Sequence, residues 1–514
     1  MKIAFRVDAS LEMGTGHVMR CLTLADALTK EGLECHFICR EHPGNLMVAI
    51  EARGHHVHSV PITSDSTPDE QLPSHAHWLG SDWRTDAEQA RQYLQDLQPD
   101  WLVVDHYGLD VRWEQQLRPV CNRLMVIDDL ADRVHDCDLL LDQTFGREVT
   151  AYKPWVPSHC TLLVGSTYAL LRPEFSELRE YSLARRDSPK LRNLLITMGG
   201  VDKDNATGDV LAVLQPGVLP EDCHLTVVMG ATAPWLASVQ EQAAALPWTV
   251  SVRVNVTDMA TLMADSDLAI GAAGSTSWER AAVGLPSLLV VTASNQALVA
   301  ESMMNAGAVV AVKLAELQDS QNIGSAITEL MTNYIDRVVI NSGICDGRGA
   351  SRIASLMRSS QSEYHHGTWL RDALLDDCEL VYRWQKQPGV RRFARNPEVP
   401  VWREHQVWYA KKIQSEASVF KIIMSADTPV GVVRLDSCTS LQGHEVSVYI
   451  ATEHCGHGFA SNALSLTRDL YPDIKIIATV LADNQASHAL FRKSGYTRVD
   501  ATTYVNAVSL EKER

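Results

Sequence analysis

The sequence lacks paired cysteines, long apolar runs and any excess of positive charge. Its eleven cysteines are odd in number and scattered, with no CxxC pair, a pattern that suits a reducing cytoplasm. No run approaches the roughly 18 apolar residues of a membrane span. The first ten residues include Arg6 and Asp8, so we expect a strand there and not a signal peptide. A net charge of −17 argues against nucleic acid. We therefore expect a cytoplasmic protein with neither membrane nor nucleic acid as a partner.

The length of the chain predicts more than one domain, because 514 residues exceed one ordinary core. Short apolar strands alternate with helices over residues 1–185, and the same rhythm restarts over residues 186–357. This alternation predicts an α/β protein with two doubly wound, Rossmann-like lobes. We expect the polar stretch 181–193 to link them. After a second polar stretch at 358–367, we expect an α+β domain over residues 368–514.

The string GTGHVMR places His17 where the first strand gives way to the first helix. Gly14 and Gly16 permit close approach of a ligand to the backbone, and the free amides of the helix start favour a phosphate or diphosphate. His17 would face that ligand, and its ordinary pKa of about 6.5 suits a general base. The alternative is an ordinary glycine turn with a capping or packed histidine.

The most informative stretch of the second lobe is GAAGSTSWERAAVG, at residues 271–284. A strand ends before Gly274, Ser275 and Thr276 open a helix, and Glu279 lies one turn in. The amides and hydroxyls would face phosphate, and an ionised Glu279 could accept both hydroxyls of a ribose. The alternative is a capping box between Thr276 and Glu279, which needs no ligand.

Other strand ends carry weaker signals. Gly199 and Gly200 follow one strand, where they could face the same ligand or only join the strand to a helix. Asn295 could contact a base or sugar, or cap the next helix. Asp128 and Asp129 invite a metal interpretation, but no spaced histidines or cysteines accompany them, so we expect solvated turn residues and no metal. Because ligands bind beyond the carboxyl ends of parallel strands, we expect the two lobes to face one cleft.

About the first 355 residues resemble a known family in five ordered stretches. They are RVDASLEMGTGHVMRCLTLADAL, VIDDLADRVHDCDLLLDQT, YALLRPEF, ITMGGVDKDN and GAAGSTSWERAAVGLPSLLVV. They are similar to the UDP-sugar hydrolases of pseudaminic acid biosynthesis, which have the two-lobed glycosyltransferase-B architecture. The resemblance implies that UDP-2,4-diacetamido-2,4,6-trideoxy-beta-L-altropyranose is hydrolysed to free sugar and UDP.

The resemblance also implies roles for particular residues. His17 would be the base that activates water. Arg172, in LLRPEF, and Glu279 match family positions near the nucleotide sugar, and Gly274, Ser275 and Thr276 match positions around the phosphates. A single displacement by water predicts inversion at the anomeric carbon.

The third domain contains a glycine loop in EVSVYIATEHCGHGFASNALSL, which alone could be an unrelated turn before a helix. Together with VLADNQASHALFRKSGYTRV it resembles the GNAT acetyltransferases. That resemblance implies that Gly456, Gly458 and Ala460 hold the pyrophosphate of acetyl-CoA, and that Asn484 positions the coenzyme or caps a helix. Residues 380–413 look more narrowly like the N-acetyltransferase of the same pathway, which acetylates the 4-amine of a UDP-amino sugar.

Two residues depart from the GNAT pattern. Cys455 opens the loop in place of arginine or glutamine, and Phe491 replaces the tyrosine that commonly protonates the departing thiolate. His488, Ser487 or a water are alternative acids, although His488 also fits a plain surface histidine. Glu445 could help to deprotonate the amine or be a solvated strand-end carboxylate.

The two resemblances predict a bifunctional enzyme, since acetylation of the 4-amine would yield the compound that the first two lobes hydrolyse. Two alternatives stay open. One is a UDP-sugar-dependent glycosyltransferase with a separate acceptor. The other is a hydrolase whose acetyltransferase domain has degenerated into a sensor, which Cys455 and Phe491 favour.

Overall fold

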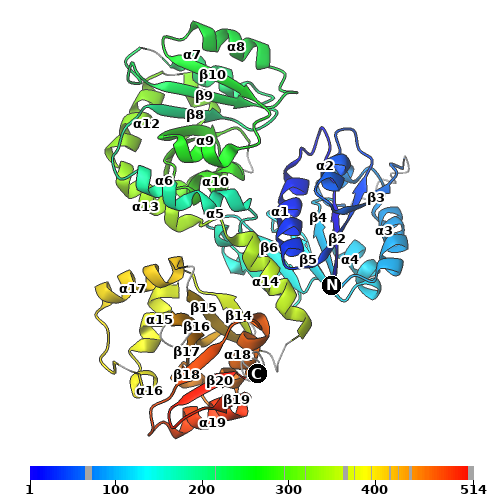
Figure 1. Cartoon of the computed structure of the whole chain (residues 1–514). Helices are drawn as coiled ribbons and strands as arrows, with labels where there is room; N and C mark the ends of the chain where they lie inside the picture. Colours follow the sequence, from blue (N-terminus) through cyan, green and yellow to red (C-terminus); the bar gives the residue numbers. More distant parts are fainter. Residues whose placement is uncertain are drawn as a thin grey trace. The chain divides into compact units, whose positions relative to one another are not determined.

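The computed structural model divides into two compact units, Met1–Ile353 and Ala354–Arg514. The first contains two parallel sheets and the second a mixed sheet (Figure 1). Helix α14 (Gly349–Ser362) carries the chain from one unit to the other. The residues described are 1–63, 72–214, 216–293, 296–318, 320–362, 368–374, 377–394, 396–415, 418–425, 428–438 and 443–506.

The first lobe is built on a sheet of seven described strands, paired in parallel in the order β3-β2-β1-β4-β5-β6-β7. The strands are β1 (Lys2–Val7), β2 (Glu34–Arg40), β3 (His56–Val60), β4 (Trp101–Asp105), β5 (Arg123–Ile127), β6 (Leu139–Asp142) and β7 (Thr161–Val164). The helices are α1 (Gly16–Lys30), α2 (Met47–Ala52), α3 (Trp83–Leu97) and α4 (Val111–Leu117), with 3-10 turns at Ala76–Leu79, Arg118–Val120, Val149–Ala151 and Ser166–Tyr168.

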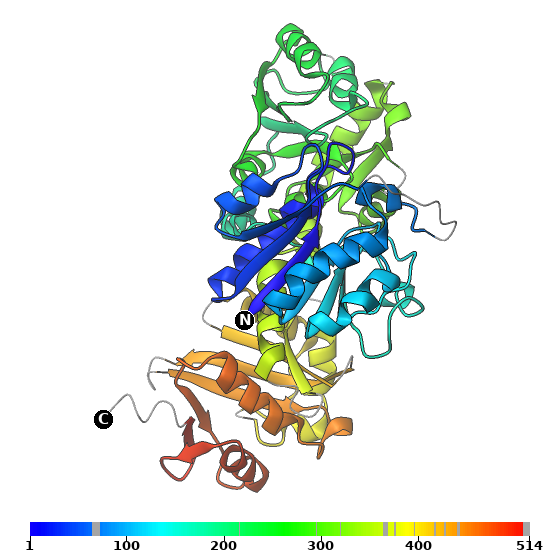
Figure 2. The ribbon, with the colours of Figure 1, turned by 90° about the vertical axis from the view of Figure 1, so that its right-hand side faces the viewer.

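Both faces of the central strands β4, β5 and β6 are covered, which is why these strands are mostly apolar, whereas the edge strand β3 is partly exposed. Alternate side chains point to opposite faces: Phe5 stacks on Phe37 of the neighbouring strand at 4.7 Å, whereas Ala4 packs in the cluster that contains α3 and the buried Trp113. Helices α1 and α3 accordingly lie on opposite faces of the blue strands (Figure 1 and Figure 2).

The second lobe repeats this plan with six described parallel strands in the order β10-β9-β8-β11-β12-β13. The strands are β8 (Asn193–Thr197), β9 (His224–Met229), β10 (Thr249–Val254), β11 (Leu268–Ala272), β12 (Ser287–Val291) and β13 (Val309–Lys313). The helices are α7 (Ala206–Val213), α8 (Leu236–Ala245), α9 (Met259–Asp265), α10 (Thr276–Ala282), α11 (Ala297–Asn305), α12 (Ser320–Thr332) and α13 (Tyr334–Ile344), with a 3-10 turn at Leu314–Gln318.

The polar stretch 181–193, expected to be a linker, is partly packed against the second lobe: Ser182, Arg186 and Leu191 are buried, whereas residues 187–190 are exposed. Helices α5 (Pro173–Glu177) and α6 (Arg179–Arg185) bring this part of the chain onto that lobe, where Phe175 is fully buried. Arg186 is 1% exposed and donates hydrogen bonds to the carbonyls of Met263 and Ser266, both at 2.9 Å. The stretch still connects the two lobes, but the guanidinium group of Arg186 binds carbonyls at the C-terminus of α9 and does not face solvent.

The second unit has a mixed sheet of seven described strands in the order β14-β15-β16-β17-β18-β20-β19. The strands are β14 (Thr368–Asp372), β15 (Ser418–Ser425), β16 (Thr428–Cys438), β17 (Gly443–Ile450), β18 (Ile476–Thr479), β19 (Tyr496–Arg498) and β20 (Thr503–Asn506). The helices are α15 (Cys378–Gln385), α16 (Pro388–Arg391), α17 (Trp402–Gln414), α18 (Phe459–Leu470) and α19 (Gln485–Lys493), with a 3-10 turn at Thr452–His454.

The strand pairing in this unit leaves an opening beside β17. Among the described strands of this unit, one pair is parallel: it joins β17 to β18 and has two registered residue pairs, His444 with Ile476 and Glu445 with Ile477. The ladder therefore covers only the first part of β17, and the two strands are unpaired toward the carboxyl end of β17. Helix α18 follows that end and packs on β14, β16 and β17.

All eleven cysteines have free thiols, and most are buried. In the described ranges, no helix has both the length and the apolar character needed to cross a bilayer.

Candidate active site

Each sheet of the first unit has a topological switch point, where two neighbouring strands lead into connections that run in opposite directions. In the first lobe β1 lies between β2 and β4, and in the second β8 lies between β9 and β11. Ligands of doubly wound sheets bind at such points, beyond the carboxyl ends of the strands. His17 follows β1 and Gly199 follows β8, while Gly274 follows β11. The predicted residues of both lobes therefore lie at switch points.

The loop that leads to His17 leaves its backbone open. Gly14 has φ +80°, a left-handed conformation that favours glycine, and a Cβ added at Gly14 or Gly16 would meet no heavy atom within 4 Å. Helix α1 starts at Gly16 after Thr15, whose side chain makes no capping hydrogen bond. Free helix amides and open glycines are what a phosphate requires.

His17 forms a hydrogen-bonded pair with Asp105, the last residue of β4. The Nδ1 atom of His17 lies 2.6 Å from Oδ1 of Asp105, and His17 is only 8% exposed. Arg20 donates to both oxygens of the same carboxylate, from Nε and a terminal nitrogen, each at 2.7 Å. Burial raises the pKa of Asp105, but the charges of Arg20 and His17 outweigh it, so that this pKa lies well below its usual range.

An ionised Asp105 determines which ring nitrogen of His17 is available for chemistry. A carboxylate only accepts hydrogen bonds, so Nδ1 carries the proton and Nε2 keeps its lone pair. Among the described residues, none makes a hydrogen bond to Nε2. A buried carboxylate oriented on Nδ1 is the arrangement that serine hydrolases use to hold a histidine base.

The neighbourhood of the pair corrects one expectation. The ring of Tyr107 lies edge-on to His17 at 4.6 Å, and its hydroxyl donates to Asp129 at 2.9 Å. Asp128 is fully buried and accepts a hydrogen bond from Arg133 at 2.7 Å. Asp128 and Asp129 are therefore not solvated turn residues. The prediction failed because the fold surrounds both carboxylates with donors: Arg133, five residues along the chain, binds Asp128, whereas Tyr107 and Arg20 bind Asp129 from other elements.

The sequence analysis gave no role beside His17 to the two residues that contact it, Asp105 and Arg20. Arg20 lies three residues after His17 and hence on the same side of α1, which is a readable signal. Asp105 ends an apolar strand, but nothing in the sequence shows that β4 pairs with β1.

A buried charge network lies next to this site. Asp86, on α3, accepts hydrogen bonds from Arg6 of β1 at 2.6 Å and from Arg40 of β2 at 2.5 Å. Asp8 accepts one from the backbone amide of Arg40 at 2.7 Å. Burial by itself would raise the pKa of Asp86. Arg6 and Arg40 outweigh that effect and hold this pKa well below its usual range. The network ties the carboxyl ends of β1 and β2 to α3.

The second lobe brings Glu279 and Arg172 together. No side-chain cap forms at the start of α10, and the hydroxyl of Thr276 accepts a hydrogen bond from Arg280 at 3.2 Å, so the capping-box alternative is wrong. Glu279 is partly buried. Burial raises the pKa of its carboxyl, while the charges of Arg172 and Arg280 oppose that rise. A Cβ at Gly274 would meet no heavy atom within 4 Å, and Ser275, the N-cap residue, is exposed.

The loop after β8 offers its glycines but not the amides of α7. Gly199 has φ +98°, and Gly199 and Gly200 are both exposed, with open space where a Cβ would lie. The carboxylate of Asp202 already accepts hydrogen bonds from the amides of Ala206 and Thr207, each at 2.9 Å. Asn295 lies outside the described residues.

In the second unit the glycine loop lies beside the opening next to β17. Gly456 and Gly458 are exposed, have φ +85° and +84°, and leave open space where a Cβ would lie. Helix α18 begins without a side-chain cap, and Ala460 lies in its first turn. Asn484 caps α19 by accepting a hydrogen bond from the amide of Ser487 at 3.1 Å.

The residues considered as acids of the acetyltransferase are more buried than expected. His488 is 6% exposed, and its Nδ1 lies 2.8 Å from the hydroxyl of Tyr504, so it is not a surface histidine. Phe491 packs between Tyr496 and Tyr504 at ring distances of 5.3 and 5.8 Å. Position 491 is therefore part of the hydrophobic core of this unit.

Two family models match the chain. Residues 212–336 match the glycosyltransferase family 28 C-terminal domain, and residues 368–497 match the acetyltransferase (GNAT) domain. The crystal structure of Acinetobacter baumannii MurG superposes with a TM-score of 0.52 at 15% identity, covering 70% of this chain and 99% of that one. The expected fold class is thereby confirmed.

Two curated relatives cover much of the chain. The uncharacterized protein MJ1062 of Methanocaldococcus jannaschii is 22% identical over 97% of both chains. The UDP-2,4-diacetamido-2,4,6-trideoxy-beta-L-altropyranose hydrolase of Campylobacter jejuni is 25% identical over 54% of this chain and 86% of its own. The chain therefore joins a two-lobed unit similar to that UDP-sugar hydrolase to a GNAT-type acetyltransferase domain.

Proposed function

We propose that the first unit hydrolyses UDP-2,4-diacetamido-2,4,6-trideoxy-beta-L-altropyranose to UDP and the free sugar. The observation that carries this proposal is the hydrogen bond between His17 and the ionised Asp105 at a topological switch point. The similarity to the Campylobacter hydrolase supports the choice of substrate. The proposed site lies between the two lobes, which both present open glycine loops at their switch points.

In the proposed reaction His17 activates a water molecule. The water oxygen attacks the anomeric carbon, its proton passes to Nε2 of His17, and the bond between that carbon and the β-phosphate oxygen breaks. The bonding electrons leave with UDP. Asp105 stabilises the imidazolium that forms, and a base held in this way contributes about 10²–10⁴ in rate. One displacement gives inversion at the anomeric carbon.

The remaining groups would bind the nucleotide and stabilise its departure. The uncapped starts of α1 and α10, with the glycines beside them, would donate amides to the diphosphate as negative charge develops there. Gly274, Ser275 and Thr276 would surround the phosphates, with Gly199 and Gly200 nearby. Glu279 would accept the ribose hydroxyls, and Arg172 would offset the charge of that carboxylate.

For the second unit we propose N-acetylation of the 4-amine of the preceding UDP-amino sugar by acetyl-CoA. The amine nitrogen attacks the carbonyl carbon of the thioester and the carbon–sulfur bond breaks. The proton that the nitrogen loses passes through solvent to the departing sulfur, so that coenzyme A leaves as the thiol. The amides beside Gly456, Gly458 and Ala460 would hold the pyrophosphate, and the match to the GNAT family model supports this assignment. Asn484 acts in this proposal as a helix cap. Neither proposed reaction requires a metal ion.

A cytoplasmic location is part of the same proposal. Free thiols at all eleven cysteines are consistent with a reducing compartment. Acetyl-CoA and UDP-sugars, the proposed substrates, would be the small-molecule partners of the protein.

A second candidate function is transfer of the sugar to an acceptor other than water. The match of residues 212–336 to the glycosyltransferase family 28 C-terminal domain favours it, because that lobe could bind the same UDP-sugar for transfer. It differs from hydrolysis in requiring an acceptor before UDP is released.

The full-length protein, incubated with the 4-amino UDP-sugar with and without acetyl-CoA, tests both activities together. Mass spectrometry should show the acetylated UDP-sugar, free diacetamido sugar and UDP only when acetyl-CoA is present. Acetylated UDP-sugar that accumulates without UDP would favour the glycosyltransferase. A lack of acetylation, with release of UDP from the ready-made diacetamido substrate, would favour a degenerate acetyltransferase domain.

A further inference from the structure

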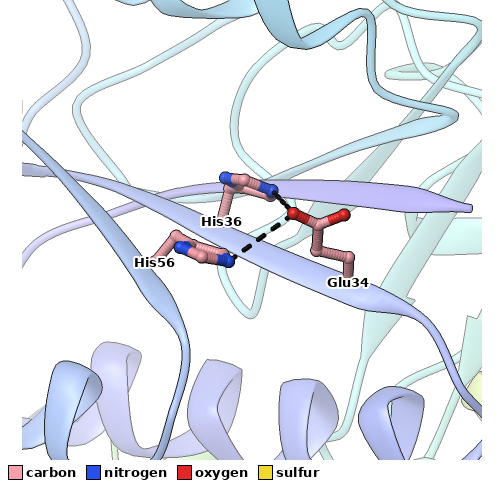
Figure 3. Close-up of side chains that lie close together, drawn as sticks. All are labelled: Glu34, His36 and His56. Carbon is pink, nitrogen blue, oxygen red and sulfur yellow. Dashed lines mark hydrogen bonds and ion pairs between the residues drawn. The ribbon is translucent and has the colours of Figure 1, made fainter.

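Glu34, His36 and His56 form a cluster at the amino ends of β2 and β3 (Figure 3). His17 and Asp105 lie beyond or at the carboxyl ends of β1 and β4 in the same parallel sheet. The cluster is therefore at the opposite edge of the sheet from the proposed active site, and that site does not explain it.

The strand geometry explains why these side chains meet. Side chains two residues apart on a strand share a face, which places Glu34 with His36 on β2 and His56 with His58 on β3. The parallel register pairs His36 with His56 and Ile38 with His58. All four polar side chains consequently lie on one face of two neighbouring strands.

The distances within the cluster fit a metal ion. Oε1 of Glu34 lies 3.0 Å from Nε2 of His36 and 3.5 Å from Nε2 of His56, and one ligand atom from each residue lies within 4.8 Å of the others. Two ligands of a tetrahedral Zn²⁺ ion, bound at about 2.0–2.2 Å, are about 3.3–3.6 Å apart. Figure 3 shows one nitrogen of His36 and one of His56 directed at the same carboxylate oxygen of Glu34.

A fourth residue supplies the outer contact that a metal-binding histidine normally has. Nδ1 of His36 lies 3.2 Å from Nε2 of His58, so His36 can donate Nδ1–H there while its Nε2 binds a cation. The ring of His58 is itself packed against Tyr93, at 4.9 Å.

We propose that Glu34, His36 and His56 bind one divalent transition-metal ion, of which Zn²⁺ is the representative, with His58 orienting His36. Two imidazoles and one carboxylate match the ligand preferences of zinc, and solvent would complete the coordination at the exposed side of Glu34 and His56. The ion would join edge strand β3 to β2, so its role would be structural.

Titration of the tag-free, full-length protein with Zn²⁺ by isothermal calorimetry tests the proposal. Wild-type protein should bind one Zn²⁺ at this site, and His56→Ala and Glu34→Gln should each weaken that binding by at least about tenfold. Both side chains are substantially exposed, so these variants should fold. His58→Phe, which removes the outer acceptor, should weaken binding about 10- to 100-fold.

His159→Ala is the matched control, because His159 is an equally exposed histidine paired with a carboxylate, Asp138, at 3.7 Å. It should bind Zn²⁺ as the wild type does. Equal Zn²⁺ affinity in wild type, His56→Ala and Glu34→Gln would overturn the proposal. It would also be overturned if wild-type protein at micromolar concentration bound no Zn²⁺ when the ion was in 100-fold excess, at about 0.1 mM.

Discussion

The 2.6 Å hydrogen bond between Nδ1 of His17 and Oδ1 of Asp105 joins the helix after β1 to the end of β4. The two residues are 88 positions apart in the chain and meet because β1 and β4 are neighbours in the sheet. Arg20 keeps the carboxylate ionised from its other side. Asp105 thereby becomes a positioning residue for the proposed base.

Asp105→Asn should lower kcat for UDP release roughly 10²- to 10⁴-fold, because an amide no longer stabilises the Nδ1–H tautomer and the imidazolium. Affinity for UDP should stay near that of the wild type. Steady-state kinetics and calorimetry measure the two quantities. The pH profile of kcat should also change, which a purely structural role of Asp105 would not produce. Unchanged kcat at every pH would contradict the assignment.

Glu279→Gln should weaken UDP binding about tenfold or more, since a charged acceptor of the ribose hydroxyls is lost. Wild type should prefer UDP over 2′-deoxy-UDP, and the variant should lose most of that preference. Calorimetry with both ligands on both proteins gives the comparison. If the variant discriminates between the two ligands as well as the wild type does, Glu279 does not contact the ribose.

Asp86→Asn should destabilise the first lobe by about 3–5 kcal/mol near neutral pH, because Arg6 and Arg40 lose their buried counter-charge. The pKa of Asp86 is lower in the folded state than in the unfolded chain, where it has the ordinary value of about 3.9. The contribution of the carboxylate to stability is therefore complete above that pH and declines as the pH falls below it. The difference between variant and wild type should therefore narrow in acid.

Hydrogen exchange of β1 and β2 amides in increasing urea, at several pH values, measures this difference. Asp96→Asn is the matched control, since Asp96 is an exposed carboxylate on the same helix, and it should change stability by less than about 0.5 kcal/mol. If the difference in stability between Asp86→Asn and the wild type stays constant from pH 7 to pH 3, the charge of Asp86 does not have the proposed role.

Gly458→Asn should separate the two activities. Asparagine tolerates the left-handed conformation at φ +84°, but its side chain would fill the open space beside the start of α18. Coenzyme A binding should weaken by about tenfold or more, while UDP release from the diacetamido substrate stays unchanged. Calorimetry and a UDP-release assay check the two outcomes. Undiminished coenzyme A binding would place the pyrophosphate elsewhere.

Much of the fold could be predicted from the sequence, because strand and helix periodicity are local properties. The strands that end at Val7, Asp105 and Ala272 are apolar and are followed by glycine or polar residues. His17 and Gly274 could be found from that pattern. The order of the strands in the sheet could not be predicted. The contact between His17 and Asp105 depends on β4 lying beside β1, so it could not be predicted either.

The differences between prediction and structure concern polar residues that the fold buries. Arg186 is buried because it binds carbonyls about 80 positions away, and Asp128 because Tyr152 and Arg133 surround it. His36 and His56 likewise have no recognisable ligand spacing, since they come from two strands. A charged side chain looks solvated in sequence whenever its partner lies on another element.

The most direct test of the account is UDP release by His17→Asn, measured together with its affinity for UDP. The account predicts a loss of turnover of about 10²–10⁴-fold with UDP affinity retained, whereas the exposed-histidine control His159→Asn stays fully active. Hydrolysis by His17→Asn at a rate near that of the wild type would contradict the proposed mechanism.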